Sequence, residues 1–92
     1  MIRVLFICTG NICRSVMAEF IMRDMLNKVG LSDRIEVSSA ATSTEELGND
    51  IYPPAKRKLL SEGVPFERHY ARQVKRSDYD QYDYLICMEQ YN

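Results

Sequence analysis

The chain has 92 residues, of which 46% are hydrophobic and 27% charged, and its formal net charge is −1. This length suffices for one small domain, and the composition is typical of a soluble globular protein. A net charge near zero excludes a general electrostatic attraction to nucleic acid or to an acidic membrane surface.

The apolar run at residues 4–8 is too short for the core of a signal peptide and far too short to span a bilayer. We therefore expect a cytoplasmic protein, whose thiols stay reduced. In that setting the three cysteines, Cys8, Cys13 and Cys87, indicate chemistry or burial and not a disulfide framework. We find no internal repeat, low-complexity tract or linker, so residues 1–92 are expected to form a single domain.

Strands and helices are predicted to alternate along the chain. A nearly continuous apolar run predicts a buried strand at 2–7, and apolar residues at helical spacing predict a helix from about Cys13 to Val29. The remaining predicted elements are a strand at 34–40, a polar loop at 42–54, a helix from about Pro54 to Glu62 and a strand at 83–88. This βαβαβ order predicts an α/β fold, a doubly wound three-layer αβα arrangement with a parallel sheet and right-handed crossovers.

The stretch "CTGNICRS" at residues 8–15 lies between the first predicted strand and helix. In an open parallel sheet, ligands bind beyond the carboxyl ends of the strands. The N–H groups at a helix N-terminus and the helix dipole favour an anion there, above all phosphate. Gly10 and Asn11 suit left-handed conformations that turn successive N–H groups toward a ligand, and the planar guanidinium of Arg14 matches two phosphate oxygens.

Cys8 stands at the end of the strand, under the same positive field. That field favours the thiolate form, so Cys8 is predicted to be a nucleophile. Ser15 is placed to donate its hydroxyl to the sulfur. The five residues between Cys8 and Arg14 allow the loop to encircle one tetrahedral oxyanion, and the implied reaction is attack by sulfur on a phosphate ester. The alternative is a tight turn with a buried cysteine and no chemistry.

At this point the sequence resembles the low-molecular-weight protein tyrosine phosphatases. The stretch "VLFICTGNICRSVMAE" is similar to their N-terminal signature, and further similar stretches are "SSAAT" (38–42), "HYARQV" (69–74) and "DYLICMEQYN" (83–92). The resemblance implies a flavodoxin-like fold and hydrolysis of phosphotyrosine through a phosphocysteine intermediate. It implies a protein or a small phosphate ester as the substrate.

The resemblance also implies a role for each matching residue. Cys8 would be the nucleophile, Arg14 would bind the phosphoryl oxygens and Ser15 would stabilise the leaving thiolate. Cys13 would be a redox partner, able to form a protective disulfide with Cys8. The loop that would hold phosphate comprises Thr9, Gly10, Asn11, Ile12, Cys13 and Arg14, and a buried network that would support it comprises Asn11, Ser39 and His69.

One departure concerns the general acid, which in that family is an aspartate followed by a proline. The 92 residues contain no Asp–Pro pair, and Asp78, Asp80 and Asp83 do not match the loop that carries the acid. The family's fourth strand and closing helix have no counterpart either. From the sequence we therefore expect a domain that is incomplete at its C-terminus. Glu45 takes a place where some members carry an aromatic residue that lines the cleft.

The sequence leaves three alternative functions open. An arsenate reductase needs two further cysteines near the third strand, where only Cys87 is found. Phosphoarginine phosphatases carry threonine where this chain has Ile12, which favours phosphotyrosine. A phosphate-binding remnant without turnover is the non-enzymatic alternative. His69 is expected to be structural and Cys87 a small buried hydrophobic residue. With no metal-ligand cluster and no nucleotide-binding loop, no metal or other cofactor is expected.

Overall fold

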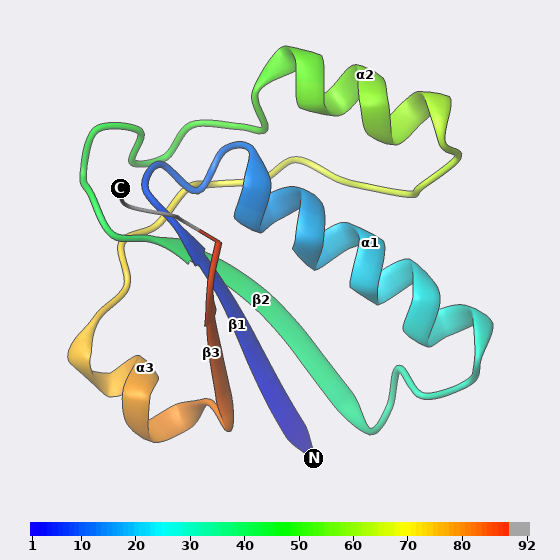
Figure 1. Cartoon of the computed structure of the whole chain (residues 1–92), viewed down its shortest axis with the longest axis horizontal. Helices are drawn as coiled ribbons and strands as arrows, with labels where there is room; N and C mark the ends of the chain where they lie inside the picture. The colour runs from blue at the N-terminus through cyan, green and yellow to red at the C-terminus, as the bar shows by residue number, and fades with distance from the viewer. Residues whose placement is uncertain (89–92) are drawn as a thin grey trace.

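A parallel three-stranded sheet carries the fold in the computed structural model, which describes residues 1–88 (Figure 1). The strand order is β2-β1-β3, and β1 pairs with both neighbours in parallel. Each predicted strand and helix is present, with bounds close to those expected. The elements in chain order are β1 (Ile2–Cys8), α1 (Arg14–Lys28), β2 (Ile35–Ala41), α2 (Pro53–Ser61), α3 (Arg76–Gln81) and β3 (Tyr84–Cys87).

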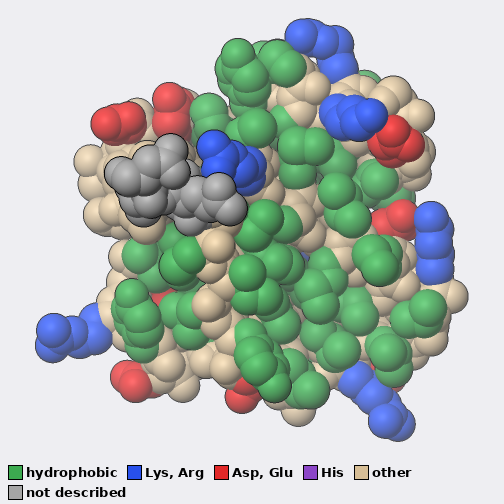
Figure 2. Space-filling view, viewed as in Figure 1, with side chains coloured by type: hydrophobic (Ala, Val, Ile, Leu, Met, Phe, Trp, Pro, Cys, Tyr) green, Lys and Arg blue, Asp and Glu red, His purple; other side chains and the backbone are tan. Residues whose placement is uncertain are grey.

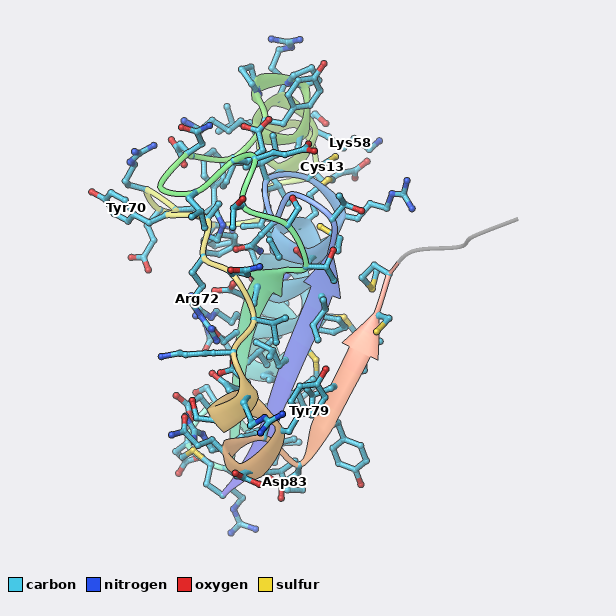
Figure 3. The ribbon with its side chains drawn as sticks, turned by 90° about the vertical axis from the view of Figure 1, so that its left-hand side faces the viewer. Cys13, Lys58, Tyr70, Arg72, Tyr79 and Asp83 are labelled. Carbon is cyan, nitrogen blue, oxygen red and sulfur yellow. The ribbon has the colours of Figure 1, made fainter. Side chains whose placement is uncertain are left out.

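Helices cover both faces of the sheet, which confirms the doubly wound α/β arrangement. In Figure 3, α1 lies behind the strands and α3 in front of them. The core accordingly has two parts. The cluster between α1 and α2 contains Val16, Phe20, Ile51, Ala55 and Leu59. The cluster on the side of α3 contains Leu5, Ile7 and Ala40, with Val74, Tyr82 and Leu85 packed against them.

The short helix α3 was not predicted, because its sequence RSDYDQ lacks an apolar face. A tertiary contact supports it instead. Asp78 is 1% exposed, accepts a hydrogen bond from the N–H of Lys75 at 2.8 Å and pairs with Arg72, which lies between α2 and α3. The helix α3 is therefore stabilised by Asp78, which caps its N-terminus and is bound by Arg72 from outside the helix, and not by an apolar face.

The prediction that Cys87 is buried is wrong, because the side chain is exposed. β3 forms one edge of the described sheet, and Tyr84 and Ile86 are also exposed, by 59% and 41%. Figure 2 shows hydrophobic side chains gathered on the viewed face of the molecule. An apolar strand sequence predicts burial only where other elements cover both faces of the strand. Within residues 1–88, no helix is long and apolar enough to cross a bilayer.

Candidate active site

The loop of residues 9–13 joins the carboxyl end of β1 to the first residue of α1, as predicted from the sequence (Figure 1). Cys8, the last residue of β1, is 4% exposed, and Asn11 and Ser15 are completely buried. Three residues of the predicted site are thus fixed in the interior at the helix N-terminus. Thr9, at the start of the loop, and Arg14, the first residue of α1, are exposed.

The backbone of the loop turns at Asn11, which has a φ of 57° and is the one non-glycine residue of the described chain with a positive φ. Asparagine tolerates this left-handed conformation better than most residues. Gly10, for which the same conformation was predicted, does not adopt it. Its lack of a side chain matters for packing instead: a Cβ atom at Gly10 would lie 3.2 Å from Cγ of Glu46.

The carbonyl groups of the loop are bound from outside by neighbouring segments. Thr9 O accepts hydrogen bonds from Ser43 N at 3.1 Å and from Ser43 Oγ at 2.8 Å. Ile12 O accepts from Tyr52 N at 2.7 Å. In a planar trans peptide the next N–H points opposite to the carbonyl. The N–H groups of Gly10 and Cys13 therefore point away from these segments, as an anion-binding nest requires.

A chain of hydrogen bonds leads to the sulfur of Cys8. The Oγ of Ser15 lies 3.0 Å from Cys8 Sγ, Asn11 N donates to the same sulfur at 3.3 Å, and Asn11 Nδ2 donates to Ser15 Oγ at 2.8 Å. Because the Ser15 oxygen accepts from Asn11, its own proton is left to donate to the sulfur. Two donors thus converge on Cys8, an arrangement that stabilises negative charge there.

The side chain of Asn11 is oriented by His69 and Arg72. His69 Nε2 lies 2.7 Å from Asn11 O and 3.1 Å from Asn11 Oδ1, and Arg72 N donates to Oδ1 at 3.2 Å. Because Oδ1 accepts from a backbone N–H, it is the oxygen end of the amide, which fixes Nδ2 as the donor to Ser15. Both atoms near His69 Nε2 are acceptors, so this nitrogen carries the proton.

The hydroxyl of Ser39, which the resemblance places in the supporting network with Asn11 and His69, contacts α1. Ser39 is buried, its hydroxyl donates to Glu19 Oε1 at 2.5 Å, and Glu19 is paired with Arg23 one helical turn later. The physical reason is the approach of α1 to β2, which places a carboxylate, a stronger acceptor than an amide, beside the hydroxyl. Asn11 and His69 are in contact, and Ser39 joins β2 to α1 through Glu19. The support of the loop by these three residues stays a prediction.

Cys13 and Arg14 stand where the loop enters α1. Cys13 precedes the helix, packs against the cluster between α1 and α2 and forms no disulfide. Its role as redox partner of Cys8 stays a prediction. Arg14 Nη1 donates to the carbonyl of Met88, just after β3, at 3.0 Å. The guanidinium therefore bridges the loop and the end of the neighbouring strand.

Arg72 and Asp78 are a feature of the site that sequence reasoning missed. The Arg72 guanidinium binds both carboxylate oxygens of Asp78, at 3.0 and 3.2 Å, and Figure 3 shows Arg72 beside the sheet. Burial alone would raise the pKa of Asp78, but the bonds from Arg72 and from Lys75 N outweigh it, so that its pKa lies below the ordinary value. The resemblance covered Arg72, yet nothing local in the sequence indicates its partner.

Replacement of Asn11 by alanine is expected to destabilise the protein by about 3 kcal/mol, because buried partners lose their hydrogen bonds. Urea denaturation measures this loss. Asn11→Gly is the matched control: it removes the same side-chain bonds but accepts the left-handed backbone, so it is expected to be about 1 kcal/mol more stable than Asn11→Ala. Equal stability of the two variants would show that the φ of 57° carries no cost.

A low pH is expected to destabilise the protein through Asp78 and Asp50, whose pKa values both lie below the ordinary value of 3.8. For carboxyl groups with lowered pKa values, the stabilisation is complete above the ordinary value and is lost as the pH falls toward the folded-state values. Urea midpoints should be constant from pH 7 to about pH 5 and fall below about pH 4. Asp78→Asn should be less stable at pH 7 and show a shallower decline; an unchanged decline would contradict this account.

Comparison with known proteins places this site in a family. The family profile described as "Low molecular weight phosphotyrosine protein phosphatase" matches residues 3–92. The chain is 45% identical over 92 residues to the low molecular weight protein-tyrosine-phosphatase YfkJ of Bacillus subtilis. It is 40% identical over 89 residues to the low molecular weight phosphotyrosine protein phosphatase of Rattus norvegicus. These matches cover 100% and 97% of this chain but 59% and 56% of the relatives, so the chain spans little more than half of their length.

Solved structures agree in fold. The crystal structure of YfkJ from Bacillus subtilis superposes with a TM-score of 0.94 at 45% identity, covering 97% of this chain and 56% of that chain. The structure of DARP, a drosophila arginine phosphatase, superposes with a TM-score of 0.87 at 31% identity, covering 94% and 54%. The described loop, strands and helices therefore have counterparts in solved proteins of similar sequence.

Proposed function

Because the chain belongs to the low molecular weight phosphotyrosine protein phosphatase family, we propose that it binds phosphate monoesters and attacks them with Cys8. The observation that carries the proposal is the pair of donors, Ser15 Oγ and Asn11 N, that converge on Cys8 Sγ at the N-terminus of α1. A reduced nucleophile suits the cytoplasmic location expected from the sequence.

The proposed reaction has two steps. The thiolate of Cys8 attacks phosphorus, an S–P bond forms, the ester P–O bond breaks and the alcohol leaves with a proton. Water then attacks phosphorus and releases inorganic phosphate and the thiolate. In the first step the inward N–H groups of the loop and Arg14 bind the phosphoryl oxygens, and in the second Ser15 donates to the departing sulfur.

The proton for the leaving alcohol is the part of the reaction that these residues do not explain. The resemblance assigns it to an aspartate before a proline, and the 92 residues contain no such pair. General acids contribute about 10²- to 10⁴-fold to such reactions. An activated ester such as p-nitrophenyl phosphate depends least on that proton. We therefore propose that this chain acts weakly on p-nitrophenyl phosphate and less on phosphotyrosine peptides.

Phosphotyrosine is the substrate we favour. Phosphoarginine is the second candidate, because DARP, a drosophila arginine phosphatase, shares the fold, but the resemblance favours phosphotyrosine on account of Ile12. Arsenate reduction is less favoured, because the family whose profile matches this chain, and the relatives compared above, are named as phosphotyrosine phosphatases. A phosphate-binding remnant would share the anion site and lack turnover.

The decisive experiment detects the covalent intermediate. The chain is incubated with p-nitrophenyl phosphate, quenched with alkali, which preserves an S–P bond that acid would hydrolyse, and digested, and the peptides are mapped by mass spectrometry. We expect one added phosphoryl group on the peptide that carries Cys8, and release of p-nitrophenol. Orthovanadate binding without phosphorylation would support the remnant, and neither binding nor phosphorylation would overturn the proposal. Paired phosphotyrosine and phosphoarginine peptides then distinguish the two substrates.

A further inference from the structure

Asp50 lies in the segment before α2, and its carboxylate contacts the residue whose ring supports the phosphate loop. Asp50 Oδ1 accepts hydrogen bonds from Ile51 N at 2.7 Å and from His69 N at 2.9 Å. Asp50 Oδ2 pairs with Lys56 Nζ and lies 3.3 Å from Arg68 Nη1. With 19% of its side chain exposed, this carboxylate joins two segments that are 19 residues apart in the sequence.

We propose that Asp50 is a positioning residue for the phosphate loop, acting through His69. Only its consequence for catalysis rests on the proposed function. The carboxylate anchors the backbone N–H of His69, and the ring of His69 reaches both Asn11 O and Asn11 Oδ1. Asn11 in turn donates to Ser15, which lies against Cys8. Three residues therefore connect Asp50 to the sulfur.

The surrounding backbone shows why the carboxylate is needed at this place. Gly48 N donates to Ala71 O at 2.7 Å, and Ala71 N donates to Asn49 O at 2.9 Å. These two bonds join the segment before α2 to residue 71. His69, two residues earlier, is joined to the same segment by the bond of its N–H to Asp50. A small shift of His69 would separate its Nε2 from Asn11, because hydrogen bonds weaken steeply with distance and angle.

The charge of Asp50 persists throughout the neutral pH range. Burial alone would raise its pKa, but the hydrogen bonds from Lys56 and from the N–H groups of His69 and Ile51 outweigh this effect, and its pKa lies well below the ordinary value. A charged acceptor binds a backbone N–H more strongly than a neutral one. At neutral pH, the hydrogen bond from His69 N to Asp50 is therefore a charge-assisted one.

A simpler interpretation is that Asp50 only forms ion pairs with Lys56 and Arg68 and stabilises the surface. The two interpretations differ in which bond of Asp50 holds the His69 ring against Asn11. If Asp50 is a positioning residue, its bond to His69 N is required for this contact and its ion pair with Lys56 is not. If Asp50 only forms surface ion pairs, removal of Lys56 acts like removal of Asp50. Lys56→Gln and Asp50→Ala therefore separate them.

The test follows the Nε2 proton of His69 in the ¹⁵N-labelled chain by NMR, which requires no catalytic turnover. In Asp50→Ala this proton should exchange with solvent at least about tenfold faster, as expected for the loss of a charge-assisted hydrogen bond. Asp50→Asn, which keeps an oxygen for His69 N, and Lys56→Gln should remain within about threefold of the wild type. Asp24→Ala is the matched control, because Asp24 is similarly buried and pairs with Lys28 on α1.

Unchanged exchange in Asp50→Ala, or an equal increase in Lys56→Gln or Asp24→Ala, would overturn the proposal. If Asp50→Ala does not fold, Asp50→Asn is the test variant. A retained signal of the His69 Nε2 proton in Asp50→Asn supports the proposal that Asp50 positions His69, and loss of that signal contradicts it. Orthovanadate affinity is measured in parallel and should fall in Asp50→Ala. If the wild type does not bind vanadate, the proposed function fails, while the His69 signal still tests Asp50.

Discussion

Replacement of Cys8 by serine is expected to abolish phosphate release and leave anion binding intact. A serine hydroxyl is a far weaker nucleophile than a thiolate, and loss of a nucleophile costs enzymes of other classes on the order of 10⁴- to 10⁶-fold in kcat. The smaller oxygen still accepts from Asn11 N and contacts Ser15, the two groups that now face Cys8 Sγ. The fold and the nest of N–H groups should therefore persist.

Two measurements check this expectation. Release of p-nitrophenol reports turnover, and titration with orthovanadate reports the anion site, which should keep its affinity to within about threefold because it consists of backbone groups and Arg14. Cys87→Ser is the matched control, since Cys87 is exposed on β3, and it should change neither quantity. Turnover by Cys8→Ser within tenfold of the wild type would show that another residue is the nucleophile.

Local sequence patterns were sufficient to predict β1, the loop after it and α1. An apolar strand, a helix with regular apolar spacing and the residues between them lie within about 25 residues, so local patterns predict these elements. The conformation of the loop also depends on contacts with distant segments, because Ser43 and Tyr52 donate to its carbonyl groups and His69 contacts Asn11. The left-handed turn was predicted for Gly10 and Asn11, but it occurs only at Asn11. The side chain of Glu46, from a distant segment, packs against Gly10.

The errors have a common physical cause, because each depends on segments far apart in the sequence. The bond from Ser39 to Glu19 was not predicted, and it forms because α1 packs against β2 at that point. Cys87 is exposed because its strand lies at a sheet edge. Similarly, Asp50 carries no local signal, and its contact with His69 appears only when the segments before α2 and before α3 come together.

Replacement of Arg14 by alanine is expected to weaken orthovanadate binding by about 10²- to 10⁴-fold. The guanidinium now donates to a neutral carbonyl, that of Met88, and a bound oxyanion would offer a charged acceptor with matching geometry. Two charge-assisted bonds, each contributing about 1.5–3 kcal/mol, account for the size of the effect.

Arg14→Lys distinguishes the geometry of the guanidinium from its charge. Lysine keeps the positive charge but binds as a point charge and not as a fork, so we expect an affinity between those of the wild type and Arg14→Ala. Raised salt should weaken binding more for the lysine variant, because a single charge contact is screened more easily than a bidentate pair held in the loop. Vanadate affinity that is unchanged in Arg14→Ala would mean that the backbone N–H groups at the start of α1 bind the anion alone, and that Arg14 serves only to join the loop to the end of β3.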